Sequence, residues 1–281
     1  MNEIIAVLPY AAPVAYAALG ETVGERSGVI NIGLEGTMLL AAYGGLIGAT
    51  HLPGAYALPG GLALACLLGV VLTVGSGLFT IVLRADQVVI GTAINLLALG
   101  VTGTLFRAEY GHSGKLLSLP VLPRFAGFDV ILVVLLLAVP AVWFLLQRTA
   151  WGLAVRSTGE YARAAEAAGY SVVRLRMQAA AFGGAMAGIG GGYLVLGTTG
   201  GFTENMTSGR GFVAIALVTF GRLNPWLVFG AALLIGYLDA LQLRLQATGA
   251  AVPRELLIAL PYIVALVVLV VVGKKRGVRM S

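Results

Sequence analysis

The chain has 281 residues, of which 59% are apolar and 11% are charged, and its formal net charge is +6. A typical soluble domain is about 45–50% apolar and about 25% charged, because its outer shell faces water. The composition therefore excludes a soluble enzyme, a disordered tail and a disulfide-rich secreted domain, and it predicts a chain whose main solvent is lipid.

Nine apolar runs reach or approach the length that crosses a bilayer, which is about 20 residues. They lie at residues 4–20, 29–50, 58–83, 88–106, 129–147, 174–196, 209–221, 225–245 and 255–272. The run 209–221 is short and is followed by Asn224-Pro225, so we expect a half-helix there. The sequence predicts an all-α fold, a single polytopic transmembrane bundle over residues 1–281 with eight or nine spans, which leaves room for re-entrant or broken helices.

The distribution of basic residues predicts the orientation, because cytoplasmic loops are enriched in Lys and Arg. With residues 148–173 and the C-terminus in the cytoplasm, 12 of the 18 Lys and Arg residues lie inside and 6 lie outside. The opposite orientation would place the basic tail at 274–276 outside. We therefore expect a cytoplasmic C-terminus and, with nine spans, an external N-terminus. The loop charges account for the basic balance, so we expect no nucleic-acid partner.

The run GETVGERSGVINIGLEG at 20–36 combines charged and polar residues with an apolar stretch. Asn31 and Glu35 are four residues apart and would share one face of a helix. Ionisable groups near lipid usually face the bundle interior or water. The run fits either a broken element beside a pathway or a charged turn at the membrane interface, and the spacing does not decide between them.

The basic loop after the fifth span predicts a short helix outside the membrane. Ser157 and Glu160 have capping-box spacing, so we expect an N-cap at Ser157, a helix over 159–168 and a stop at Gly169. The small residues of this helix give it a smooth surface that could dock in a partner's groove. A helix lying on lipid is the alternative, but the large apolar anchors that lipid binding prefers are missing.

Two further groups of residues have a predicted role. Gly184, Gly188 and Gly192 form a small-residue face, which predicts close helix packing, with a hinge as the alternative. Asn95 and Asp239 lie at membrane depth and predict either a polar path wall or interhelical hydrogen bonds. The sequence has no phosphate-binding loop, nucleophile elbow or metal-ligand spacing, so we expect no cofactor and no enzymatic activity.

The motif GERSGVINIGLEG at 24–36 resembles the permease subunits of ABC importers of the sugar, nucleoside and branched-chain amino acid group. Its form is most similar to the nucleoside and simple-sugar branch, and the resemblance covers nearly the whole chain. It implies a permease of the type II importer class whose cytoplasmic helix near 158–169 couples to a separate ATPase subunit, which binds the ATP. By position, the resemblance assigns the coupling role to Gly159, Glu160, Ala164, Ala165, Ala168 and Gly169. The charged Arg163 of the same helix is added as a candidate.

One departure concerns the coupling helix, which has Glu160-Tyr161 where family members usually have residues such as Asn-Pro. The resemblance also implies partners: a homologous but different second permease, an ABC ATPase and an external binding lipoprotein, in a prokaryotic inner cell membrane. A purine or pyrimidine nucleoside is the first expected solute, before simple sugars and branched-chain amino acids. Asn31, Glu35, Asn95 and Asp239 are weak candidates for the pathway. The rival hypotheses are a secondary transporter driven by an ion gradient and a non-transporting membrane subunit.

Overall fold

The computed structural model describes residues 2–111, 119, 121–125, 127–248 and 263, and every regular element of these residues is helical. The α-helices are α1 (Asn2–Arg26), α2 (Leu34–His51), α3 (Ala57–Gly77), α4 (Gln87–Tyr110), α5 (Val130–Arg148), α6 (Ala150–Glu160), α7 (Ala162–Ala167), α8 (Val172–Tyr193), α9 (Arg210–Phe220) and α10 (Pro225–Ala247). A 3-10 turn, η1 (Gly54–Tyr56), precedes α3, and π-helical turns extend α3 and α8 as η2 (Leu78–Val82) and η3 (Leu194–Thr199). The predicted all-α class is therefore confirmed.

Five helical segments among the described residues are long and apolar enough to cross a membrane. They are Gly54–Val82, Gln87–Tyr110, Val130–Arg148, Val172–Thr199 and Pro225–Ala247. The chain is therefore a multi-pass membrane protein, while the number of eight or nine spans stays a prediction. The predicted span 255–272 lies outside the described residues except at Ile263. The expected half-helix is observed as α9, which has 11 residues.

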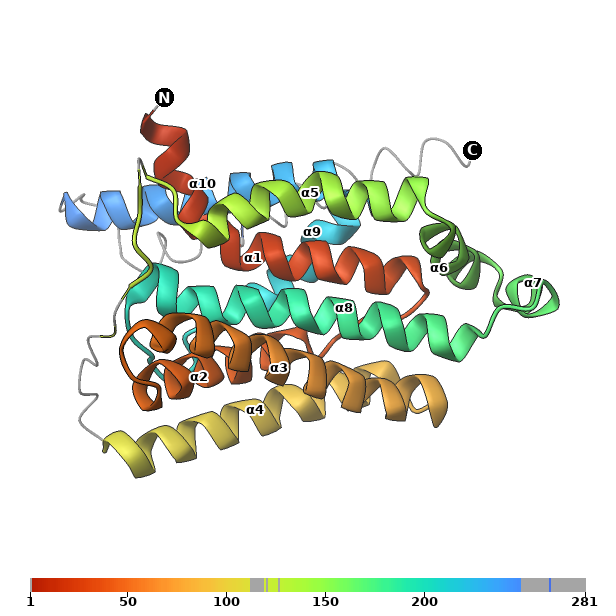
Figure 1. Ribbon diagram of the computed structural model, residues 1–281, viewed down its shortest axis with the longest axis horizontal. Helices are drawn as coiled ribbons and strands as arrows, with labels where there is room; N and C mark the ends of the chain where they lie inside the picture. The colour runs from red at the N-terminus through yellow and green to blue at the C-terminus, as the bar shows by residue number, and fades with distance from the viewer. Residues whose placement is uncertain (1, 112–118, 120, 126, 249–262, 264–281) are drawn as a thin grey trace.

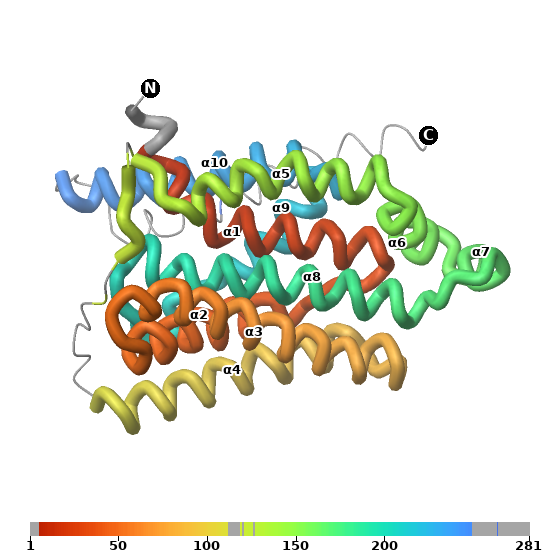
Figure 2. The backbone as a smooth tube through the Cα atoms, viewed as in Figure 1, coloured from red at the N-terminus to blue at the C-terminus, as the bar shows by residue number. Residues whose placement is uncertain are grey.

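The long helices lie side by side along the longest axis of the molecule, and α6 and α7 project from one end of the bundle (Figure 1). We call this end the α7 end. The same arrangement is visible in the backbone trace, where α8 and α1 run through the middle of the bundle (Figure 2). Of the apolar window in Val172–Thr199, 78% is buried, against 22–33% in the other four spanning segments. The helix α8 therefore belongs to the core, together with the buried helices α1 and α2, while α3, α4, α5 and α10 leave apolar faces for lipid or another subunit.

Glycines allow α8 to pack closely against α3. A Cβ atom at Gly188 would lie 2.8 Å from Cα of Cys66, and one at Gly192 would lie 2.7 Å from Cβ of Ala65. A Cβ at Gly184 would lie 2.8 Å from the hydroxyl oxygen of Thr73. Side chains at these three positions would push the two helices apart, which is the packing geometry that small-residue faces provide in membranes.

The helix boundaries expected from Ser157 are wrong. Ser157 lies inside α6, whose N-cap is Thr149; the Thr149 hydroxyl accepts a hydrogen bond from the Gly152 N–H at 3.0 Å. The helix then continues to Glu160 and breaks at Tyr161, and α7 follows as a separate short helix. Ser157 instead donates its hydroxyl proton to the Ala154 carbonyl at 2.8 Å. The predicted stop at Gly169 is correct, since α7 ends at Ala167, Ala168 is its C-cap, and Gly169 follows with a φ of +86°.

Candidate functional site

The connection between α1 and α2, residues 27–33, contacts the end of α6, and we call it the α1–α2 loop. Gly28 has a φ of +87°, and a Cβ atom there would lie 3.1 Å from Cα of Gly159. A Cβ atom at Gly159 would in turn overlap the carbonyl oxygen of Arg26. Both positions therefore require glycine. The polar motif around 24–36 and the predicted coupling segment around 157–169 therefore meet at this contact.

Arg176 of α8 binds both sides of this contact. Its Nε donates to the Ser27 carbonyl at 3.1 Å, and its Nη2 donates to the Thr158 carbonyl at 3.4 Å. Hydrogen bonds from a charged donor contribute about 1.5–3 kcal/mol each when their partners are shielded from water. Arg176 therefore ties α6, α8 and the α1–α2 loop together. No pattern in the sequence distinguished it from the exposed Arg174 two residues earlier.

The α1–α2 loop is also attached to the membrane-embedded helices. The Asn31 N–H donates to the Glu21 carboxyl of α1 at 2.8 Å, and the Ile30 N–H donates to the Gln87 side chain of α4 at 3.2 Å. At the end of α1, the Arg26 guanidinium donates to the carbonyl oxygen of Leu223, in the turn between α9 and α10. Hydrogen bonds therefore connect the α1–α2 loop to α1 and α4, and connect the end of α1 to the turn after α9.

Two candidate pathway residues, Asn31 and Asn95, help to place the start of α2. The expectation that Asn31 shares a helix face with Glu35 is wrong, because α2 begins only at Leu34 and Asn31 lies in the loop before it. Asn95 of α4 donates to the Ile32 carbonyl at 3.0 Å and accepts from the Gly36 N–H at 2.8 Å. Of the two expected roles of Asn95, this geometry favours the interhelical hydrogen bond. A role of Asn95 in the wall of a pathway stays a prediction.

The other two candidates, Glu35 and Asp239, surround the start of α9. The buried Glu35 carboxylate accepts hydrogen bonds from the Gly209 N–H at 2.8 Å and the Gly211 N–H at 2.6 Å. Asp239 of α10 pairs with Arg210 at 3.5 Å. The first N–H groups of a helix have no intrahelical acceptor and carry partial positive charge, which a carboxylate satisfies. Glu35 therefore caps the half-helix, whether or not it also faces a solute.

Replacing Glu35 by alanine should lower stability substantially. The change leaves two shielded backbone N–H groups without an acceptor, at about 1–3 kcal/mol for each. The midpoint of thermal unfolding of the purified permease in detergent should fall by several degrees, within the range such a loss produces. Glu204→Ala is the matched control, because its ion pair with Arg107 is about half exposed and contributes about 0–1 kcal/mol. Equal shifts for the two variants would contradict the capping role of Glu35.

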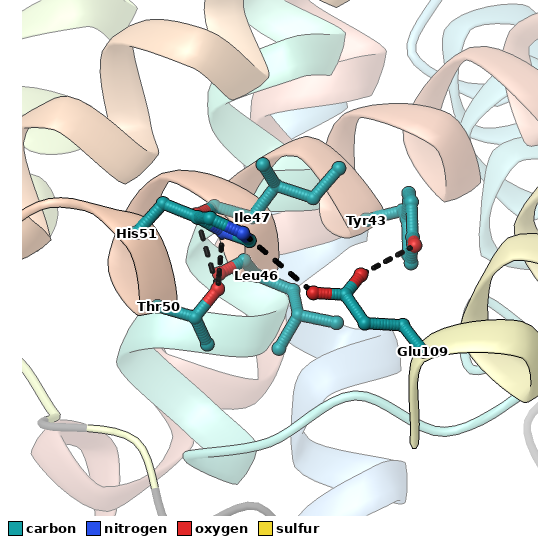
Figure 3. A network of polar contacts seen from close by, with 6 residues as sticks. All are labelled: Tyr43, Leu46, Ile47, Thr50, His51 and Glu109. Carbon is teal, nitrogen blue, oxygen red and sulfur yellow. Dashed lines mark hydrogen bonds and ion pairs between the residues drawn. The ribbon is translucent and has the colours of Figure 1, made fainter. Parts of the chain in front are cut away.

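The end of the bundle opposite the α7 end carries a different polar network (Figure 3). Glu109 of α4 lies 3.7 Å from His51 Nε2 and accepts a hydrogen bond of 3.5 Å from the Tyr43 hydroxyl, both on α2. The His51 and Glu109 side chains are largely solvent-accessible, so this pair joins α2 and α4 weakly. Within the described part of the chain, no group of three His, Cys, Asp or Glu residues could hold a metal ion.

The observations define a multi-pass helical membrane protein with a polar, tightly connected region at one end, an architecture suited to a transport subunit. A family model described as "Branched-chain amino acid transport system / permease component" matches residues 3–273. The chain therefore belongs to this permease family. No solved structure matches it.

Several curated relatives are similar over most of the chain. The guanosine ABC transporter permease protein NupQ of Bacillus subtilis is 34% identical, covering 94% of this chain and 89% of the relative. The putative glucose ABC transporter permease protein TsgC13 of Haloferax volcanii is 35% identical, covering 84% and 75%. The nucleoside ABC transporter permease protein NupC of Lactococcus lactis is 28% identical, covering 94% and 89%.

Proposed function

We propose that this chain is a permease subunit of an ATP-driven ABC importer that forms part of the translocation pathway for a purine or pyrimidine nucleoside. The observation that carries the proposal is its 34% identity to a guanosine permease over 94% of the chain. The similarity to a putative glucose permease supports simple sugars as the second candidate. ATP is bound and hydrolysed by a partner subunit, and this chain has no catalytic role.

The corner formed by α6 and α7 is the proposed coupling element. It projects from the bundle (Figure 2). Tyr161, at the break between the two helices, is 76% exposed. Arg163 and Ala164 are also exposed, whereas Ala165 is 3% exposed and faces the protein. We therefore assign docking on the ATPase to the exposed side of the corner. The residues of the proposed coupling element are Gly159, Glu160, Arg163, Ala164, Ala165, Ala168 and Gly169.

The α7 end is proposed to face the cytoplasm of a prokaryotic cell. It carries a concentration of basic residues, as cytoplasmic ends of membrane proteins do. These residues are Arg26, Arg148, Arg156, Arg163, Arg174 and Arg176. The opposite end then receives solute from an external binding lipoprotein, and a homologous second permease completes the pathway. A cytoplasmic C-terminus follows from the same charge distribution, although the tail lies outside the described residues.

The contacts of the α1–α2 loop supply a mechanism for alternating access. Closure of the ATPase subunits on ATP moves α6 and α7 as a unit. The Gly28–Gly159 contact and Arg176 pass this displacement to the α1–α2 loop. The loop then moves α1, α2 and α4 as packed bodies, and Glu35 carries the half-helix α9 with α2. The external binding protein supplies solute affinity, so the permease needs no tight site.

Reconstituted uptake tests the proposal. Proteoliposomes containing this chain, the second permease and the ATPase receive the binding protein outside and ATP inside, and uptake of radiolabelled guanosine is measured. We expect uptake that requires ATP, survives collapse of ion gradients and is inhibited by unlabelled nucleosides but not by glucose. Uptake that continues without ATP and stops when Na⁺ and H⁺ gradients collapse would support a secondary transporter instead. No guanosine uptake, together with ATP-dependent uptake of radiolabelled glucose by the same proteoliposomes, would assign the sugar alternative.

A further inference from the structure

Glu21 is a buried carboxyl group in α1 that the mechanism above does not explain. Its residue is 2% exposed, and none of the ion pairs among the described side chains includes it. One carboxyl oxygen accepts the Asn31 N–H at 2.8 Å. Burying an acidic group without a cationic partner is costly. The position therefore calls for a specific role.

The hydrogen bond from Asn31 folds the α1–α2 loop back onto α1. Glu21 lies five residues before the end of α1, about 7.5 Å along the helix axis. The Val29 N–H donates to the Gly24 carbonyl at 3.2 Å, which begins the same reversal of the chain. These bonds hold the loop at the end of α1, where Gly28 contacts Gly159. Without an acceptor at position 21, the Asn31 N–H would lose its partner and the loop would lose this attachment.

A small cavity lies beside Glu21 and is lined by polar groups from several elements. Its volume of about 30 Å³ has room for one ordered water, which needs polar partners around it. Asn31, Thr73 and Gln87 line it together with Glu21. Thr73 is 4% exposed, and its hydroxyl oxygen has no hydrogen-bond partner among the described residues. Glu21 therefore borders a polar cavity, and a water held there would supply a polar partner without a cation.

We infer that Glu21 is a positioning residue: it holds the α1–α2 loop against α6 so that movement of the coupling corner reaches α2, α4 and α9. This role requires an acceptor oxygen at the distance of a glutamate side chain and does not require a negative charge. The inference rests on the proposed function for its consequence in transport. Its local part, the placement of the loop by Glu21, stands on the geometry alone.

Three substitutions separate these requirements. Glu21→Gln keeps an acceptor at the same distance without the charge, Glu21→Asp keeps the charge but is one methylene shorter, and Glu21→Ala removes both. The first readout is hydrogen–deuterium exchange of residues 27–33 in the purified permease. The second is the number of nucleoside molecules imported per ATP hydrolysed by the assembled importer. Glu204→Gln is the control, because Glu204 is an exposed acid paired with Arg107 in the last turn of α4, whereas the loop contacts Gln87 at the start of α4.

We expect Glu21→Gln to match the wild type in both readouts within about twofold. Glu21→Ala and Glu21→Asp should exchange about tenfold faster in the loop and import about fivefold fewer molecules per ATP, because one shielded hydrogen bond is lost. Unchanged exchange in the alanine variant would overturn the inference. A glutamine variant as impaired as alanine would overturn it too, since charge would then be required. If the wild-type importer shows no coupling, the proposed function fails, while the exchange data still decide the placement of the loop.

Discussion

Replacing Gly159 by valine is expected to reduce ATP-driven uptake by at least about fivefold while the ATPase remains bound. The new Cβ would overlap the Arg26 carbonyl oxygen and lie 3.0 Å from the Gly28 nitrogen. Both neighbours are backbone atoms that cannot rotate away, so α6 and the α1–α2 loop must separate. Overpacking of this kind costs about 1–3 kcal/mol, which weakens the contact by about fivefold to more than a hundredfold. Uptake and ATP hydrolysis are measured together in proteoliposomes.

The matched control for this variant is Gly75→Val in α3. No atom lies within 4 Å of the position of its Cβ, so the same change in size meets open space. It should leave the ratio of uptake to ATP hydrolysis unchanged. If Gly159→Val transported as well as Gly75→Val, close backbone contact at Gly159 would not be needed for coupling.

The second large effect is expected for Arg176→Ala. The change removes the donors to the Ser27 and Thr158 carbonyls, so α8 no longer holds the α1–α2 loop and α6 together. Each of these hydrogen bonds contributes about 1.5–3 kcal/mol, so the loss of even one corresponds to a roughly tenfold to hundredfold weaker contact. Nucleoside uptake should fall by at least about tenfold in the same proteoliposome assay.

Two further variants test this explanation for Arg176. Arg176→Lys should recover only part of the uptake, because an ammonium group is not a planar fork that bridges two carbonyls. Arg174→Ala removes an exposed positive charge from the same helix and should behave as the wild type. Equal losses of nucleoside uptake in Arg174→Ala and Arg176→Ala would contradict this explanation. They would show that uptake depends on the positive charge at the α7 end and not on the hydrogen bonds of Arg176.

Local and compositional patterns predicted the class of the fold well. The apolar runs, the half-helix at 209–221 and the stop at Gly169 each depend on a short stretch of chain. Wherever such a stretch lies within the described residues, the structure shows a helix or a helix end there. The capping pattern at Ser157 misled because Thr149 already caps α6, and the helix passes through Ser157. A local signal was overridden there by an earlier helix start, which is a common limit of such patterns.

The long-range contacts of the site were beyond sequence reasoning. Glu35 and Asn95 were recognised as unusual polar residues, but their partners are backbone groups. For Glu35 these groups lie 174 and 176 residues away in the chain. Arg176 and Glu21 likewise act on backbone atoms, which any residue type supplies. A single sequence therefore contains no complementary pattern that could reveal such pairs.

Cross-linking at position 164 tests the central claim that the α6–α7 corner meets the ATPase. The native Cys66 is first replaced by alanine, and a cysteine is then introduced by Ala164→Cys, at an exposed position of α7. Ala165→Cys is the neighbouring control, because Ala165 is 3% exposed. We predict that Ala164→Cys cross-links to the ATPase subunit in the purified importer and that Ala165→Cys does so far less. Labelling of position 164 by a membrane-impermeant reagent added outside intact cells, with no cross-link to the ATPase, would contradict it.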